Sequence, residues 1–139
     1  MIGRQHPGES NGSHVIKGSI EALLSDDPFS VSLMEHCEFV VIPMLNPDGV
    51  VAGNFRTSLY GKDLNRLFRT KDTTLLPEVE MARTVFTELH ETYKKKLLLF
   101  LDYHGHSTRK NAFVLGPGIF DAQLLNDIRT LPKMMAETT

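Results

Sequence analysis

The sequence predicts an α/β protein in which helices alternate with the strands of a mixed, mainly parallel sheet. Apolar residues recur at helical spacing in two segments, Ser10 to Leu24 and Pro77 to Lys96. A compact apolar run follows each helical region, at Cys37 to Met44 and at Leu97 to Tyr103. Nearly continuous apolar strands are typical of a parallel sheet that helices cover on both faces. We therefore expect an α/β/α sandwich.

The first half of the chain should contain a helix, a short helical turn and a buried strand. The helix over Ser10 to Leu24 is expected to stop at the breaker Ser25-Asp26-Asp27-Pro28. After the helical turn, the β-branched run Cys37 to Met44 suits a strand. Residues 46 to 69 then carry Pro, Gly and Asn without periodicity, and a loop of this length inside a compact domain is usually functional. Its opening Asn46-Pro47-Asp48-Gly49 has strong turn chemistry, which should shape the loop behind a site.

The second half should contain two helices and two strands. Pro77 suits the first turn of a helix that ends in Lys94, Lys95 and Lys96, where cations favour a helix carboxyl end. Strands are expected at Leu97 to Tyr103 and Asn111 to Gly116, and a helix over the last twenty residues. Both ends of the chain look abrupt, because only five residues precede His6, where a strand is expected to lead into the loop, and the expected last helix stops without a partner. We expect the domain to be truncated at both ends.

Composition argues against several classes of partner. The formal charge of the 139 residues is −2, without a Lys/Arg stripe that would attract nucleic acid or an anionic membrane surface. The longest apolar run, Leu97 to Leu101, is far shorter than the roughly 20 residues that span a bilayer, and no secretory leader opens the chain. We expect a soluble, non-secreted protein that binds neither nucleic acid nor membranes.

The segment Arg4-Gln5-His6-Pro7-Gly8-Glu9-Ser10 is the most informative for chemistry. It places an imidazole and a carboxylate three residues apart around a Pro-Gly turn that can aim both at one point. Two nitrogen ligands, one carboxylate and an open position form a common catalytic zinc environment, so a distant third ligand is required. His104 is the best candidate, because it ends a predicted strand at the sheet edge where ligands bind in α/β proteins.

Other side chains near His104 leave alternatives open. His106 becomes a possible ligand if the strand extends that far, because alternate strand positions share a face. Asp102 shares the face of His104, and either supports the ligand or accepts backbone donors. The histidines at helix-like positions, namely His14, His36 and His90, are expected to be surface or packing residues.

Five motifs resemble, in order, those of the zinc metallocarboxypeptidases, specifically the cytosolic carboxypeptidase (protein deglutamylase) subgroup. They are HPGES at residues 6–10, NPDGV at 46–50, GNFR at 53–56, GKDLNR at 61–66 and DYHGHS at 102–107. The resemblance covers most of the chain and implies a zinc carboxypeptidase-like fold. It also implies one Zn²⁺ ion bound by His6, Glu9 and His104.

The resemblance assigns further roles in the loop before the second helical region. Arg56 would face the carbonyl oxygen of the scissile peptide and stabilise the oxyanion, and Asn65 with Arg66 would hold the terminal carboxylate of the substrate. The chemistry of guanidinium groups agrees with both roles, because their planar donors suit a carboxylate and a fixed cation stabilises a developing anion. Asp63 would accept the free ring N–H of His6 and fix its tautomer. Without the order of the motifs, these charges would be ordinary solvated loop residues.

The resemblance also indicates what is missing. In this family the glutamate that acts as general base lies well downstream of the third zinc ligand, so the general base is expected not to be in this chain. The resemblance further leads us to expect that the amino-terminal β-rich domain of cytosolic carboxypeptidases and the residues that read the terminal side chain lie outside residues 1–139. We expect residues 1–139 to be a partial catalytic domain that is inactive alone.

The expected function is a cytoplasmic zinc-dependent exopeptidase that removes carboxy-terminal amino acids from peptide or protein tails. For the cytosolic subgroup, the resemblance suggests removal of glutamate from acidic tails, such as those of tubulin. One alternative is a non-catalytic zinc-binding or protein-interaction module, which a missing general base would favour. A second is an amidohydrolase of the desuccinylase and aspartoacylase group, which shares HxxE and a distant histidine; HPGES with GKDLNR argues against it.

Overall fold

The computed structural model describes residues 1–118 and 121–138. The chain divides into two compact units, Met1–Gly105 and His106–Thr139. The first unit contains β1 (Ile2–Gly3), α1 (Ser10–Leu23), α2 (Pro28–His36), α3 (Pro47–Val51), a 3-10 turn η1 (Leu64–Arg66), α4 (Pro77–Tyr93), a second 3-10 turn η2 (Lys94–Lys96) and β2 (Asp102–Tyr103). The second unit contains α5 (Ala122–Thr138). No helix in the described part of the chain has both the length and the apolar character needed to cross a membrane.

Two extended segments lie parallel to β1, one on each side. β1 pairs with β2 in the register Ile2–Asp102 and Gly3–Tyr103, and a single bridge joins Ile2 to Ile42 on the other side. The amide of Gly3 donates to the carbonyl of Ile42 (3.0 Å), and the amide of Ile2 donates to that of Leu101 (2.9 Å). The α/β class and the parallel pairing are therefore confirmed, with β1 between the two other segments.

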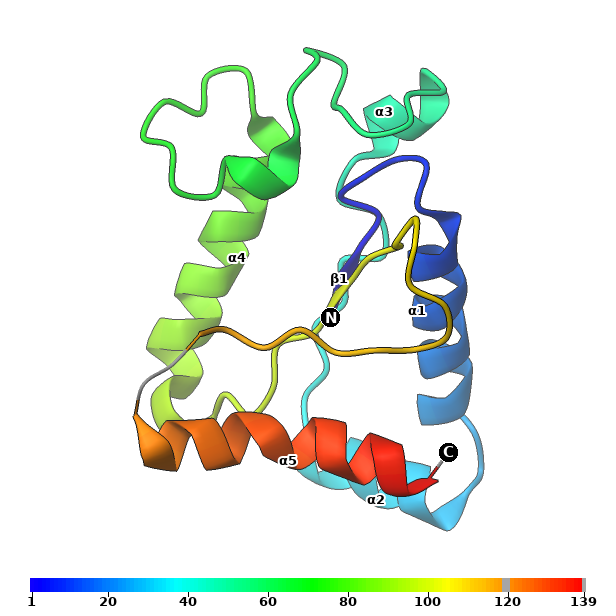
Figure 1. Ribbon diagram of the computed structural model, residues 1–139. Helices are drawn as coiled ribbons and strands as arrows, with labels where there is room; N and C mark the ends of the chain where they lie inside the picture. Colours follow the sequence, from blue (N-terminus) through cyan, green and yellow to red (C-terminus); the bar gives the residue numbers. More distant parts are fainter. Residues whose placement is uncertain (119–120, 139) are drawn as a thin grey trace. The chain divides into compact units, whose positions relative to one another are not determined.

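Helices cover both faces of β1, as Figure 1 shows for α1 and α4. Successive strand residues point to opposite faces, so Ile2 and Gly3 contact different helices. Ile2 joins the buried core with residues of η1 and α4; this core comprises Ile2, Leu45, Leu64, Leu76, Val79 and Ala82. Gly3 faces α1, where a Cβ at this position would lie 2.6 Å from Cδ1 of Ile16. A side chain at this position would therefore require the end of the Ile16 side chain to move.

The helices follow their local sequence signals. The predicted helix at residues 10–24 is confirmed as α1, and the helical turn before residue 37 is α2, whose cap Asp27 accepts from the amides of Phe29 and Ser30. α4 begins at Pro77, as predicted, with Glu78 and Glu80 in its first turn. The helix predicted over the last twenty residues is confirmed as α5, while residues 120 and 139 lie outside the described residues.

The strand predictions were largely wrong. Residues 37–44 contribute only the bridge at Ile42, and residues 97–100 form no ladder, with Leu98 81% exposed. β1 explains this, since it offers only Ile2 and Gly3 as partners before Arg4 adopts a left-handed φ of 56°. The predicted strand at residues 111–116 is also absent, and Asn111 at its start has a left-handed φ of 63°, which breaks an extended run.

Candidate metal centre

The turn between β1 and α1 holds His6 and Glu9 close together. Arg4 follows β1, and its guanidinium fixes the turn by donating from Nε to the carbonyl of Pro7 (2.7 Å) and from Nη1 to Oγ of Ser13 (2.9 Å). The amide of Glu9 donates to the carbonyl of His6 (3.1 Å), directly before α1 begins. Nδ1 of His6 then lies 2.8 Å from Oε1 of Glu9, and His6 is only 3% exposed.

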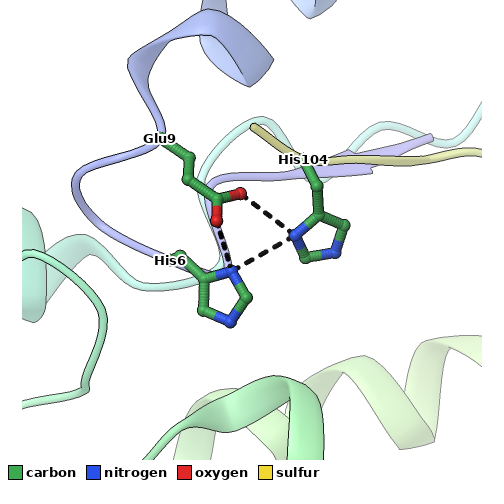
Figure 2. Close-up of side chains that lie close together, drawn as sticks. All are labelled: His6, Glu9 and His104. Atoms are coloured by element: carbon green, nitrogen blue, oxygen red, sulfur yellow. Dashed lines mark hydrogen bonds and ion pairs between the residues drawn. The ribbon is translucent and has the colours of Figure 1, made fainter. Parts of the chain in front are cut away.

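His104 reaches the same point from the end of β2, as Figure 2 shows. Its Nδ1 lies 3.2 Å from Nδ1 of His6 and 3.1 Å from Oε2 of Glu9. The amide of Gly105 also donates to Oε2 of Glu9 (2.7 Å), which holds the carboxylate against the loop after β2. One potential ligand atom from each of His6, Glu9 and His104 lies within 4.8 Å of the others. The three side chains proposed as ligands are therefore together in the structure.

A carboxylate lies behind each of the two imidazole rings. Nε2 of His6 is 3.0 Å from Oδ1 of Asp63, and Nε2 of His104 is 3.0 Å from Oδ2 of Asp102. An ionised carboxylate only accepts hydrogen bonds, so each ring donates from Nε2 when it pairs with this partner. A neutral ring then leaves its lone pair on Nδ1, which is the atom facing Glu9 and the other histidine. Both histidines are thus oriented with Nδ1 as the available ligand atom.

This arrangement suits a cation better than it suits hydrogen bonding. With both rings neutral, two Nδ1 lone pairs and the oxygens of Glu9 converge without any donor between them. Two imidazole nitrogens and one carboxylate are a common set of protein ligands in catalytic zinc sites, so this cluster fits zinc. Without a metal, a proton can occupy the position between the Nδ1 atoms and the carboxylate of Glu9. The hydrogen bond to Asp102 raises the pKa of His104, against the opposing effect of burial, and the negative charge of Glu9 adds to the increase.

Asp63 connects the metal cluster to the loop with the predicted substrate-binding residues. Its Oδ1 caps η1 by accepting from the amide of Asn65 (3.0 Å), and its Oδ2 accepts from both Nε and Nη2 of Arg56 (2.8 Å each). Burial raises the pKa of Asp63. The hydrogen bond from His6 and the charge of Arg56 outweigh this effect, so that the pKa of Asp63 lies below its ordinary value. The guanidinium of Arg66 is exposed and has no ion-pair partner among the described residues.

These residues match a known family over most of the chain. The sequence model of the zinc carboxypeptidases matches residues 1–114. The chain belongs to the zinc carboxypeptidase family. This confirms the resemblance that the five motifs carry, and zinc is the cofactor that the family implies for the cluster.

Curated relatives narrow the resemblance to the cytosolic carboxypeptidases. Cytosolic carboxypeptidase 1 of Danio rerio is 40% identical over 150 positions, which cover 99% of this chain and 13% of that protein. Cytosolic carboxypeptidase 4 of Mus musculus is 42% identical, over 97% of this chain and 13% of that protein. A solved metallo-carboxypeptidase from Burkholderia cenocepacia is 34% identical, with a TM-score of 0.66 over 76% of this chain and 27% of that chain. The chain thus spans about an eighth of the length of these curated relatives.

The other histidines of this zinc carboxypeptidase chain have separate positions. His14, His36 and His90 are exposed on α1, α2 and α4, in agreement with a surface role. His106 lies in the second unit, where its Nδ1 accepts from the amides of Thr108 and Arg109. Of the two roles considered for Asp102, support of the ligand or acceptance of backbone donors, the contact of its Oδ2 with the ring of His104 agrees with the first.

Sequence reasoning missed two buried polar residues behind the cluster. Nε2 of Gln5 donates to Oδ2 of Asp102 (2.6 Å), and Nδ2 of Asn46 donates to the carbonyl of Gln5 (3.1 Å). Asn46 also caps α3, since its Oδ1 accepts from the amide of Gly49 (3.0 Å). The turn signal identified the Asn46 loop, but no spacing pattern connects Gln5 with a residue 97 positions later.

Proposed function

We propose that this chain is the zinc-binding part of a carboxypeptidase, in which His6, Glu9 and His104 hold one Zn²⁺ ion. The observation that carries the proposal is the convergence of both Nδ1 atoms on the carboxylate of Glu9, with each Nε2 held by a second carboxylate. Zinc in such a site acts as a Lewis acid that activates water and polarises a carbonyl group. Asp63 and Asp102 keep the two imidazoles in the tautomer that binds metal.

The loop that contains Asp63 supplies the proposed contacts to substrate. Arg56 stabilises the oxyanion that develops at the scissile carbonyl, and Asn65 and Arg66 bind the terminal carboxylate. Support comes from proximity, because Asp63 contacts a proposed ligand, pairs with Arg56 and caps the turn that carries Asn65 and Arg66. The exposed Arg66 is available to a carboxylate, whereas Arg56 must exchange part of its pairing with Asp63 for a contact with substrate.

An acidic peptide tail is the substrate class that this loop favours. Residues 56–71 carry five cationic side chains, Arg56, Lys62, Arg66, Arg69 and Lys71, against the single anion Asp63. A loop with this excess of positive charge attracts an acidic tail, and this attraction weakens with salt because the Debye length is about 8 Å at physiological ionic strength. We accordingly propose glutamate as the residue removed and acidic tails such as those of tubulin as substrates. The names of the relatives support a cytosolic location.

Residues 1–139 should not hydrolyse peptides by themselves. Each carboxylate found at the cluster already has a partner: Glu9 contacts both histidines, and Asp63 and Asp102 each contact one ring. None of the three is therefore free to act as general base, which typically contributes about 10²- to 10⁴-fold to the rate. Zinc-dependent release of a terminal amino acid by these residues alone would contradict this expectation.

The activity is best tested in a chimera. In this chimera, the chain replaces the aligned segment of the Mus musculus cytosolic carboxypeptidase 4. We expect zinc-dependent release of glutamate from a peptide ending in several glutamates, and no cleavage of the same peptide with an amidated carboxyl terminus. A His104→Ala chimera controls for folding without metal. Equal cleavage of the amidated peptide would contradict an exopeptidase, and a folded, zinc-loaded chimera without activity would favour a binding module.

A further inference from the structure

We infer that Gln5 is a positioning residue for the metal centre, acting through Asp102 on the proposed ligand His104. The inference rests on the proposed zinc site. Gln5 directly precedes His6 in the sequence and is only 2% exposed. Its Nε2 donates to Oδ2 of Asp102 at 2.6 Å. This is the oxygen that lies 3.0 Å from Nε2 of His104.

The shared oxygen explains how Gln5 acts on a ring that it does not touch. The carboxylate of Asp102 can rotate about its terminal torsion, which is broad and roughly two-fold. The amide of Gln5 donates to the same oxygen that contacts the imidazole, and it thereby holds the plane of the carboxylate relative to the ring. The ring of His104 then keeps its proton on Nε2, and its Nδ1 points toward His6 and Glu9. Gln5 therefore fixes the orientation of the carboxylate that orients the ligand.

Gln5 is itself held at its backbone. Nδ2 of Asn46 donates to the carbonyl of Gln5 (3.1 Å), and Asn46 is fully buried. Gln5 thus lies just after β1, directly precedes the ligand His6, and contacts Asp102 in β2 through its side chain. Gln5 therefore connects the two segments that supply the two histidines. A change in the spacing of β1 and β2 would move these ligands apart.

Packing alone does not explain an amide at this position. Oε1 of Gln5 and Oδ1 of Asp102 are both buried and have no hydrogen-bond partner among the described residues. A buried acceptor without a partner costs stability, and an apolar side chain of the same length would avoid that cost. The hydrogen bond that the Gln5 amide donates to Asp102 explains why an amide, and not an apolar side chain, occupies this position.

The test compares Gln5→Met with the unchanged protein in three measurements. Methionine keeps the length of the side chain and removes the N–H and the unpartnered oxygen. We expect zinc affinity, measured by chelator competition, to fall about tenfold, the low end for residues that support a ligand. The absorption spectrum of the Co²⁺-substituted protein should change, and the Tm of the metal-free protein measures separately how much folding stability the lost hydrogen bond to Asp102 contributes. Ser58→Ala is the matched control, since Oγ of Ser58 is also buried without a partner but belongs to a residue outside the cluster.

A double-mutant cycle shows whether Asp102 transmits the effect. In an Asp102→Ala background, Gln5→Met should weaken zinc binding no further. Unchanged affinity and an unchanged Co²⁺ spectrum in Gln5→Met would overturn the inference, as would losses that simply add in the double variant. Failure of the unchanged protein to bind zinc at all would instead contradict the proposed function, so the two failures are distinguishable.

Discussion

Nδ1 of His6 and Nδ1 of His104 lie 3.2 Å apart, although the residues are 98 positions apart in the sequence. The contact follows from the parallel pairing of β1 and β2, whose carboxyl ends share one edge of the sheet. His6 comes three residues after β1, and His104 comes directly after β2. Because Asp63 and Asp102 hold the far sides of the rings, the site depends on the β1–β2 register and on two carboxylates from distant segments.

We predict that the loop behind His6 has no room for a side chain at Gly49. A Cβ there would lie 2.6 Å from both Oδ1 of Asn46 and Cγ of Pro7, and 2.8 Å from the carbonyl oxygen of Thr57. Gly49→Ala should lower the free energy of unfolding by about 1–3 kcal/mol, as overpacking usually does. Urea denaturation measures the change.

The control for this variant is Gly18→Ala in α1. A Cβ at Gly18 would contact nothing within 4 Å, and alanine favours a helix over glycine by roughly 0.5–1 kcal/mol. Gly18→Ala should therefore stabilise the protein. Equal effects of the two substitutions would show that packing around Gly49 is not the constraint.

We also predict that Leu64 anchors the substrate-binding loop to the core. Leu64 is fully buried against α4 and lies between Asp63 and Asn65 in the sequence. Leu64→Ala should cost about 2–5 kcal/mol of unfolding free energy and weaken zinc binding, because Asp63 loses its fixed position. Leu59→Ala, at a residue 59% exposed in the same loop, should change stability by no more than about 0.5 kcal/mol. Full zinc affinity in a destabilised Leu64→Ala protein would contradict the link to Asp63.

The two loop arginines should fail differently in the chimera. Arg56→Ala removes stabilisation of charge that exists only after attack, and should lower kcat by roughly 10²- to 10³-fold. It also removes the ion pair of Asp63, so zinc affinity should fall as well. Steady-state kinetics on a peptide ending in glutamate, together with chelator competition, measure both effects.

Arg66→Ala should mainly raise KM, because the terminal carboxylate is present in both ground state and transition state. Zinc affinity should not change, since the side chain of Arg66 has no described contact with Asp63. Arg66→Lys should rescue little, because a point charge cannot replace a planar fork of donors. The same kinetic pattern in both alanine variants would contradict separate roles for Arg56 and Arg66.

Features set by neighbouring residues could be predicted from the sequence. The helices were predictable because apolar spacing and terminal prolines are local signals, as Pro77 illustrates in α4. The three clustered side chains were predictable because HxxE places two of them three residues apart, His104 follows an apolar run, and the resemblance to the zinc carboxypeptidases implies all three as ligands. A catalytic zinc site needs a third protein ligand, and His104 is the histidine in a suitable position.

Features set by partners distant in the sequence could not be predicted. A strand exists only where another segment pairs with it, so the apolar run at residues 97–103 contributes just Asp102 and Tyr103 to the ladder. The contact between Gln5 and Asp102 likewise depends on β1–β2 register. The pairing of Arg56 with Asp63 joins two charges whose separate roles, but not whose contact, were expected.

The most direct test of the metal centre is zinc analysis of the purified protein after incubation with excess zinc and removal of unbound metal. We predict about one zinc ion per chain, as expected for a single site with three protein ligands. His104→Ala should lose this zinc, and His90→Ala, at an exposed histidine on α4, should retain it. Absence of bound zinc in the unchanged protein, or full binding by His104→Ala, would contradict a site formed by His6, Glu9 and His104.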